Sequence, residues 1–563
     1  MRTLKWFFVF VAMVTLLVAC GPAPTPQTVE KIVTQVVPVK ETVVVAGTPQ
    51  VVRETVVVAG TPQVVEKVVT ATPKPSATPV TEPQRGGTLN MSLGTDFVDF
   101  DPFMDVDGCE FKPIVFEAPV RFSDAGQLEP WLAESYEVSK DGLSVTLKLR
   151  KGVMFHTGRE MKADDVIWSV DRARDTKLGT HLSDRFTTCT GATKIDDYTV
   201  RINYNQITHS ALDAIARLYI FPKESVDKIK TVPVGTGPFK YQEWIPGDHL
   251  TIVRFDNYWR KGEPYLDKVV IRAIPDDQAR MVNLLAGSID LLGRVPLADI
   301  DLLKKAPGVV IISQPPGFSF DAFLFNVTKP PFDNTLVRQA MNYAIDREKM
   351  RQLAYYGNGE MTMLPYATTS WAYPKDLEKY YSFDLNKAKE LLTKAGYPNG
   401  FETEILIRGT GGTALAVAQI WQQDLAKVGV KMKVVPTELP QYWPKLFASE
   451  FAIVSHATGE ATVDPSGLFQ GAACCRPFRN FFKITENKEW FPKYEAIIKQ
   501  SGLELDQQKR KALYHDALTI FVEQGWTIPL GWRQWTFASK DFVKGIRSDM
   551  DACLWINRAW LAK

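Results

Sequence analysis

Several features that mark enzymes are missing from this chain. It has six histidines among 563 residues, and none lies at metal-ligand spacing from another. No Gly-x-Ser-x-Gly, His-Glu-x-x-His or Gly-x-x-x-x-Gly-Lys-Ser/Thr motif occurs, so the local signatures of serine hydrolases, zinc proteases and ATP-binding loops are absent. We therefore predict that the chain is not an enzyme and carries no cofactor, metal or ATP. An extracellular hydrolase with a scattered triad is the remote alternative.

An excess of one charge and a second long hydrophobic run are missing as well. The 66 Lys and Arg residues nearly balance the 64 Asp and Glu residues, for a net charge of +2. This balance gives no field that would attract nucleic acid. Beyond the N-terminus, no segment has the roughly 20 apolar residues that a spanning helix needs. We predict a globular protein with more than one lobe and no nucleic-acid partner.

Cysteine is sparse, with six residues in the chain. Cys20 follows the N-terminal apolar run and belongs with it, so five cysteines remain, which is an odd number. An odd count in an exported protein predicts at least one free thiol or an unusual pairing. Because no Cys-x-x-Cys and no nearby His accompanies the adjacent pair, a structural disulfide from that pair is favoured over a metal site, with its partner left open. The five are Cys109, Cys189, Cys474, Cys475 and Cys553.

The N-terminus does carry a targeting signal. Arg2 and Lys5 precede an apolar run of about 13 residues, which is too short to span a membrane. We predict a signal peptide over residues 1–19. The Leu-Val-Ala-Cys ending resembles a bacterial lipobox, which implies lipidation at Cys20 and a membrane-anchored protein that faces the periplasm or the cell exterior. An ordinary signal peptide with a chance cysteine is the alternative.

Residues 20–85 are of low complexity. A 13-residue repeat rich in Val and Thr runs through residues 41–52 and 54–65, and Pro and Thr dominate residues 72–79. The segment has few side chains that could form a core, so we predict an extended stalk. A strand-forming repeat that self-associates is the alternative, because runs of Val favour strands.

Beyond residue 85, segments with a strand-like hydrophobic pattern alternate with segments that have a helical one. Period-two patterns predict strands, and helical patterns with acidic starts or glycine ends predict helices. This alternation predicts an α/β fold. The predicted strands are 88–93, 143–149, 198–204, 249–255, 268–273, 401–407 and 431–435, and the predicted helices are 276–286, 337–344, 385–395 and 414–428.

An ordered set of short motifs resembles a known family. It includes Pro130-Trp131-Leu132-Ala133-Glu134, Phe155-His156-Thr157-Gly158, Gly235-Thr236-Gly237-Pro238-Phe239, Asn257-Tyr258-Trp259-Arg260-Lys261-Gly262 and Ala344-Ile345-Asp346-Arg347. Together they resemble the extracytoplasmic solute-binding proteins of ABC importers, family 5, the peptide, nickel and opine type. The resemblance covers nearly all of residues 86–563.

The resemblance implies a type II, class C-like fold of the periplasmic-binding-protein kind, in which two lobes close over a ligand. It implies a monomer that delivers its solute to ABC permease subunits with a cytosolic ATPase. It also places an extra subdomain on the first lobe. The implied boundaries are 86–120, 239–315 and 526–563 for lobe I, 121–238 for the subdomain, and 316–525 for lobe II.

The resemblance also implies a ligand-binding cleft between the two lobes, and it suggests candidate contact residues there. Peptide binders of the family hold the ligand's amino terminus with an acid before an acidic-Pro pair, and Asp464-Pro465 is such a pair here. The matching offset holds Ala461, so we expect Glu460 to substitute after a one-residue shift, and a ligand that lacks a free amine is the alternative. Amphipathic aromatic side chains suit a pocket. The remaining candidates are Asn326, Trp371, Tyr373, His456, Trp532 and Trp535.

The sequence thus predicts capture of a di- or oligopeptide. A nickel chelate, an opine, haem or an oligosaccharide in the same role is the alternative. His156 lies in a tight turn before a helix, so we interpret it as structural rather than as a ligand.

Overall fold

The computed structural model describes most of the chain beyond residue 50. The described residues are 51–58, 61–68, 82–104, 110–123, 127–178, 180, 182–314, 319–365, 368, 370–409, 412–458, 464–465, 483–533, 535–549 and 553–563. They fall into two compact units, 1–79 and 80–563. No helix in these ranges combines the length and the apolarity needed to cross a membrane.

In the first unit, β1 (Val51–Val58) and β2 (Thr61–Val68) pair as an antiparallel hairpin. Both strands come from the Val- and Thr-rich repeat, for which the sequence leaves an extended stalk and a strand-forming segment as alternatives.

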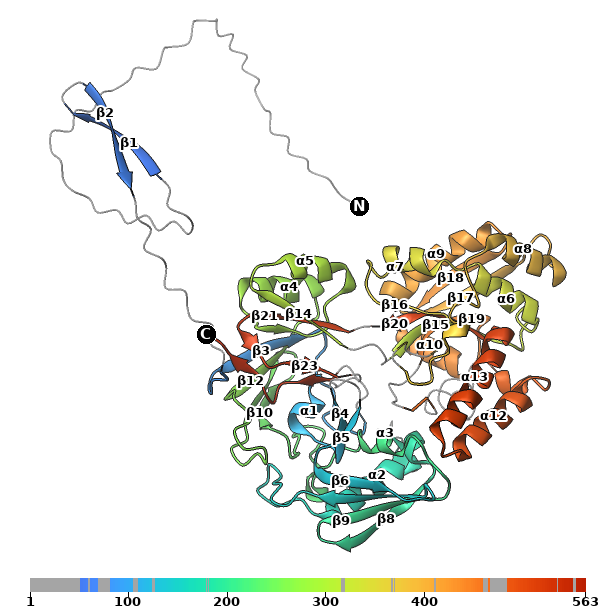
Figure 1. The fold of residues 1–563 in the computed structure, drawn as a ribbon, viewed down its shortest axis with the longest axis horizontal. Coiled ribbons are helices and arrows are strands. Elements are labelled where there is room, and N and C mark those ends of the chain that lie inside the picture. The colour runs from blue at the N-terminus through green and yellow to red at the C-terminus, as the bar shows by residue number, and fades with distance from the viewer. Residues whose placement is uncertain are drawn as a thin grey trace, which may run out of the picture. The chain divides into compact units, whose positions relative to one another are not determined.

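Lobe I of the second unit is built on a seven-stranded sheet (Figure 1). The strand β3 lies inside the sheet and runs parallel to both of its neighbours. Its Leu89 and Met91 side chains are fully buried, as the alternating pattern predicts. In sheet order the strands are β10 (Phe239–Ile245), β11 (His249–Arg254), β12 (Lys268–Ala273), β3 (Thr88–Leu93), β13 (Leu291–Leu292), β21 (Thr536–Lys540) and β14 (Val309–Ser313).

Two helices accompany this sheet, α4 (Asp277–Ala286) and α5 (Ile300–Lys305). The N-cap of α4 is Asp276, whose carboxylate accepts a hydrogen bond from the backbone N–H of Ala279. The helix ends at Gly287, which adopts a left-handed conformation with φ of 80° that favours glycine. Asp276 and Gly287 were both visible in the sequence, and they fix where α4 begins and where it ends.

Lobe II is built on a six-stranded sheet with its own core. In sheet order the strands are β16 (Glu360–Met361), β20 (Thr527–Arg533), β15 (Ser319–Phe325), β19 (Ile453–Thr458), β17 (Glu402–Arg408) and β18 (Lys431–Thr437). The helices of its described residues lie around it (Figure 1), namely α6 (Thr335–Tyr343), α7 (Arg347–Leu353), α8 (Leu385–Lys394), α9 (Gly412–Ala426), α10 (Leu439–Phe447), α12 (Phe491–Leu503) and α13 (Gln507–Gln524).

An extra subdomain lies within residues 121–238. It has a four-stranded antiparallel sheet in the order β6 (Ala133–Val138), β7 (Ser144–Leu149), β9 (Thr199–Tyr204) and β8 (Cys189–Asp196). Two helices, α2 (Ala163–Arg174) and α3 (Ala211–Ile215), belong to it. Its hydrophobic core is continuous with that of the seven-stranded sheet, so the subdomain is joined to lobe I.

Shorter elements complete the unit. They are α1 (Lys112–Val115), the pair β4 (Val120–Phe122) and β5 (Leu128–Pro130), the pair β22 (Val543–Lys544) and β25 (Trp560–Leu561), and the pair β23 (Arg547–Ser548) and β24 (Leu554–Trp555).

The chain crosses between the two large sheets twice, from β14 to β15 and from β20 to β21. The second crossing corrects a predicted boundary. We expected lobe I to resume at residue 526, but β20 pairs with β15 of lobe II, with Arg533 opposite Ser319. The crossing therefore follows Arg533, because the buried strand before it completes the sheet of lobe II.

Candidate functional site

A cavity of about 770 Å³ lies between the two sheets. Residues of lobe I line one side of it, and residues of lobe II line the other. Its size falls within the range of small-molecule pockets, which is roughly 300–1,000 Å³. Since both lobes contribute walls, a bound solute would contact both at once. We call this cavity the cleft.

The lobe II wall is formed where two parallel strands end and two helices begin. Arg408 is the last residue of β17, and Gly412 begins α9 in the same wall. Glu438 follows β18 and is the N-cap of α10. In open α/β sheets, ligands bind at the carboxyl ends of the strands. The N-termini of both helices add positive partial charge that favours an anionic group.

The lobe I wall carries two arginines that already have carboxylate partners. Arg280 pairs with Asp277 in the first turn of α4, and its Nη1 donates to the carbonyl of Ile274 at 2.7 Å. Arg294 pairs with Glu110. Each cation is therefore neutralised within its own lobe.

Arg408 differs from these two arginines. Its side chain is exposed, and it has no carboxylate partner among the described residues. Its guanidinium carbon lies 5.0 Å from the ring centroid of Trp443, a cation–π distance that orients the head group. The cleft thus contains an oriented cation that is available to a ligand carboxylate.

Of the predicted site residues that the structure describes, His456 and Trp535 line the cleft. The His456 Nδ1 atom lies 3.2 Å from the hydroxyl of Tyr442, and its ring meets Trp443 edge-on with centroids 6.1 Å apart. Trp535 stacks under Arg294, whose guanidinium carbon is 4.4 Å from the indole centroid. Both aromatic groups are held by neighbours, so they can supply rigid contact area to a ligand.

Three other predicted residues are buried in lobe II and do not line the cleft. Asn326 is 2% exposed, and its amide donates to the carbonyl of Ser449 at 3.0 Å. Trp532 is also 2% exposed and packs on Phe320. Tyr373 is buried in the same hydrophobic core. The structure therefore gives these three side chains packing contacts, and their contact with a ligand stays a prediction.

Asp464 and Trp371 lie together at a different place. The Asp464 carboxylate accepts from Arg510 Nη1 at 2.5 Å and from the Tyr514 hydroxyl at 3.1 Å. Trp371 packs on Tyr514, and the Arg510 guanidinium carbon lies 5.3 Å from its ring centroid. These contacts tie Asp464 and Trp371 to α13. None of these residues lines the cleft.

Several predictions lie outside the described residues. Glu460, the proposed amine contact, is one of them, and so are the lipidation residue Cys20 and the cysteines 109, 474 and 475. Cys189 is a buried thiol without a disulfide. No group of three metal-ligating side chains occurs in the part of the chain that the structure describes.

The sequence analysis missed Arg408, Glu438 and the lobe I arginines. A signal for Arg408 was present, because it directly follows the strand predicted at 401–407 and precedes Gly409, at the position where α/β sheets present ligand-binding groups. The lobe I side chains carried no such signal, because their approach to the cleft depends on the pairing of β13 and β21, which are distant in sequence.

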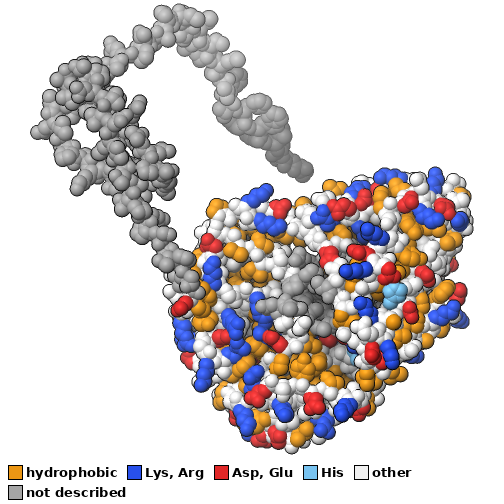
Figure 2. All heavy atoms as spheres, viewed as in Figure 1, with side chains coloured by type: hydrophobic (Ala, Val, Ile, Leu, Met, Phe, Trp, Pro, Cys, Tyr) orange, Lys and Arg blue, Asp and Glu red, His pale blue; other side chains and the backbone are white. Residues whose placement is uncertain are grey.

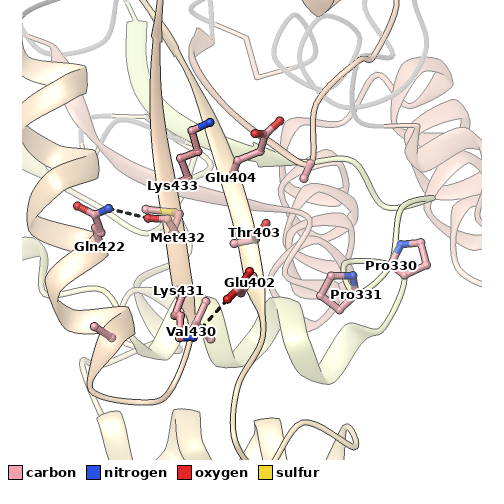
Figure 3. Close-up of a pocket in the computed structure, with 12 residues that line it drawn as sticks. Pro330, Pro331, Glu402, Thr403, Glu404, Gln422, Val430, Lys431, Met432 and Lys433 are labelled. Atoms are coloured by element: carbon pink, nitrogen blue, oxygen red, sulfur yellow. Dashed lines mark hydrogen bonds and ion pairs between the residues drawn. The ribbon is translucent and has the colours of Figure 1, made fainter.

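A second hollow, of about 720 Å³, lies entirely on lobe II (Figure 3). Charged side chains of β17 and β18 line it, and Lys431 pairs with Glu402 at 3.2 Å. Gln422 donates to the carbonyl of Met432 at 2.6 Å. No residue of lobe I lines this hollow, so it lacks the two-sided character of the cleft.

Charge of both signs is mixed on the face of the second unit that Figure 2 draws. Figure 2 shows basic and acidic side chains interspersed over the face drawn. This agrees with the small net charge of the chain. Attraction of a charged solute therefore depends on local groups such as Arg408 rather than on a long-range field.

The chain is similar to known proteins in sequence and in fold. The family model described as "Bacterial extracellular solute-binding proteins, family 5 Middle" matches residues 127–479. Heme-binding protein A of Haemophilus influenzae is 31% identical over 467 residues, which are 77% of this chain and 84% of that protein. Glutathione-binding protein GsiB of Escherichia coli K12 is 32% identical over 366 residues, which are 62% of this chain and 70% of that protein.

Solved structures show the same fold. The periplasmic binding protein DppA of Helicobacter pylori, in complex with the peptide STSA, has a TM-score of 0.71 and 28% identity, over 84% of this chain and 99% of that one. NikA of Brucella suis, in complex with Fe(III)-EDTA, has a TM-score of 0.76 and 24% identity, over 84% of this chain and 100% of that one. The α/β two-lobe prediction is confirmed.

Proposed function

Because this chain belongs to the family 5 extracellular solute-binding proteins of ABC importers, we propose that its cleft captures a di- or oligopeptide through the peptide's terminal carboxylate. The family's members are binding proteins of transporters, so the chain acts outside the cytoplasm with permease partners and is not an enzyme.

The observation that carries the cargo proposal is the state of the three cleft arginines. Arg280 and Arg294 are neutralised by carboxylates of their own lobe, whereas Arg408 has no carboxylate partner among the described residues. Trp443 holds the Arg408 guanidinium in place, and the start of α9 lies beside it. A carboxylate that arrives in the cleft would pair with Arg408 and receive the positive end of a helix.

The opposite sign is also present in the cleft. Asp321 and Glu438 line it, together with apolar surface from Phe323 and Leu439. A zwitterion with apolar side chains matches this mixture better than an uncharged sugar does, because each end meets an opposite charge. Glu460 remains the proposed partner of the peptide's amino terminus, and Cys20 remains the proposed lipid anchor.

Native mass spectrometry of the full chain, purified without added ligand, tests the cargo directly. Bound masses that fragment into peptides are the expected result. A tetrapyrrole, a metal chelate or a sugar would keep the transport role and replace the cargo, and haem in particular would point to His456 as a contact in the cleft.

Calorimetric titration tests the role of Arg408. We expect Arg408→Ala to weaken binding of a peptide with a free carboxylate by roughly ten- to a hundredfold, the range for a hydrogen bond to a charged group. The same peptide with a C-terminal amide should bind the variant and the wild type equally. Arg201→Ala is the matched control, because Arg201 is exposed on β9 in the subdomain. Equal losses for both peptides would exclude a carboxylate contact.

A further inference from the structure

The sheet of lobe II has one long free edge among the described residues. The outermost strands of this sheet are β16, which has two residues, and β18, which has seven. An outermost strand presents a row of backbone N–H and C=O groups with which another strand can pair. β18 is therefore the edge at which the sheet of lobe II could accept an additional strand.

The backbone of β18 points alternately toward β17 and toward the free edge. The N–H of Lys431 donates to the carbonyl of Phe401 at 2.8 Å, and Thr437 exchanges two backbone hydrogen bonds with Gly409. Both ends of the strand thus direct an odd-numbered residue toward the side of β17. Because the backbone direction alternates along a strand, the N–H and C=O groups of the even-numbered residues point away from β17. These outward residues are Met432, Val434 and Pro436.

Two features alter the hydrogen-bonding groups of this edge. Gln422 of α9 donates its side-chain N–H to the carbonyl of Met432 at 2.6 Å, on the side of β18 away from β17 (Figure 3). Pro436 has no backbone N–H, so the edge lacks a donor at that position. Of the three outward residues, only Val434 is affected by neither feature.

A second copy of this chain matches the register of this edge. If two β18 strands pair antiparallel about their central residue, Met432 of each copy lies opposite Pro436 of the other. Outward residues then face outward residues, and Lys433 lies opposite Val435, so that no two lysines meet. The carbonyl of Met432 would need an N–H from residue 436 of the second copy. Proline cannot supply it, and the carbonyl already has a side-chain donor.

We propose that the edge of β18 is a strand-pairing surface for a second copy of this chain, and that Gln422 and Pro436 keep it closed so that the chain stays monomeric. Both act on one bond, between the C=O of residue 432 and the N–H of residue 436 of the second copy. Opening the surface therefore requires both to be changed. None of Gln422, Met432, Val434 and Pro436 lines the cleft, so the proposal does not depend on the cargo.

Amide hydrogen exchange of the wild-type full chain, resolved to single residues by mass spectrometry, tests the free edge. The N–H of Val434 points away from β17, so we expect it to exchange at least about tenfold faster than those of Lys433 and Val435. This rate should not change with protein concentration. Slow exchange at Val434, or a rate that falls as the concentration rises, would overturn the proposal, because the edge would then be covered in the wild type.

The double variant with Gln422→Ala and Pro436→Val restores the missing bond. We expect it to dimerise in sedimentation velocity, and its Val434 amide to exchange at least about tenfold more slowly at high than at low concentration. Each single variant should associate less than the double variant, because one feature still opposes the bond. Gln423→Ala with Pro398→Val is the matched control, since both residues are exposed and neither is part of β18.

A double variant whose Val434 amide exchanges equally at every concentration would overturn the proposal. Association through residues 20–85 would appear equally in the wild type, the control and the double variant, so it cannot produce the expected difference. The wild-type exchange rates decide the question if the double variant does not fold. No ligand is added, so a wrong cargo leaves these measurements untouched, and a failure here leaves the Arg408 titration untouched.

Discussion

Gln314 and Trp535 join the two segments on which the lobes are connected. The backbone N–H of Gln314 donates to the carbonyl of Trp535 at 2.9 Å, and the backbone N–H of Trp535 donates to the Gln314 side-chain oxygen at 3.2 Å. Gln314 follows β14 and Trp535 precedes β21, so the pair lies where both crossings leave the sheet of lobe I. The two crossings are therefore coupled, and any movement of one lobe on the other must be absorbed beside this pair.

Gln314→Ala should weaken this coupling. Gln314 is fully buried, and its loss would leave the N–H of Trp535 without that acceptor, at a cost of about 1–3 kcal/mol. Urea unfolding should report the loss, and the Trp535 amide should exchange faster. Gln500→Ala, at an exposed position in α12, should change neither quantity. A variant as stable as the wild type would show that the side-chain bond does not tie the crossings.

Glu117 is a buried carboxylate that joins the subdomain to lobe I. It accepts from Trp131 Nε1 and the Tyr258 hydroxyl, both at 2.7 Å, and from Trp259 Nε1 and the Thr236 hydroxyl, both at 2.9 Å. Burial raises the pKa of this carboxyl, while the four donors oppose the shift.

Glu117→Gln should therefore destabilise the fold strongly. An amide offers one acceptor oxygen where four donors converge, and its NH₂ group would face two of them. We expect a loss of roughly 2–4 kcal/mol in urea unfolding, from the penalty for buried donors left unsatisfied. Glu134→Gln, at an exposed position in β6, is the matched control. A loss no greater than that of the control would mean that the four bonds contribute little.

Glu460→Ala tests the proposed amine contact. We expect it to weaken binding of peptides with a free amino terminus by more than about tenfold, because an ammonium group loses its charge partner. Acetylated peptides should bind the variant and the wild type alike. Calorimetry with both peptides gives the result, and equal affinities throughout would remove Glu460 from the site.

Local patterns in the sequence located most of the fold elements. The strands predicted at 88–93 and 268–273 match β3 and β12 to the residue, and the helix predicted at 276–286 matches α4 with Asp276 as its cap. These elements carry their own signals, namely alternation, a capping acid and a terminal glycine. The order of strands within each sheet carries no such local signal, which explains why β20 was assigned to the wrong lobe.

The candidate site was harder to predict for a related reason. Aromatic type suggested Trp532 and Trp535 equally, yet the first packs in the core of lobe II and the second lines the cleft. The difference depends on where β20 ends and the crossing begins. The position of Arg408 after a predicted strand could be read from the sequence. Its contact with Trp443 could not, because Trp443 comes from α10, a separate helix.

His156 provides a pH prediction for the stability of the whole unit. Its Nδ1 accepts from the backbone N–H of Gly235 at 3.3 Å, which fixes the tautomer, and its Nε2–H donates to the carbonyl of Gly237 at 3.0 Å. The ring also packs edge-on against Phe255. Sequence analysis interpreted this histidine as structural, and the neutral ring is fully satisfied by its neighbours.

Burial lowers the pKa of His156 to about 4, against a smaller opposing effect of the Gly237 carbonyl. A proton on Nδ1 would face the N–H of Gly235, so the folded state resists protonation while the unfolded chain accepts it near 6.5. The contribution of the neutral His156 ring to folding stability is complete above that pH and is lost as the pH falls from about 6.5 to about 4, by roughly 3 kcal/mol in total.

Urea unfolding across this pH range should show the loss of stability in the wild type. His156→Gln should be less stable at neutral pH and lack this component of the acid dependence, whereas His515→Gln, at an exposed position in α13, should retain it. An unchanged acid dependence in His156→Gln would show that the loss of stability arises from other groups.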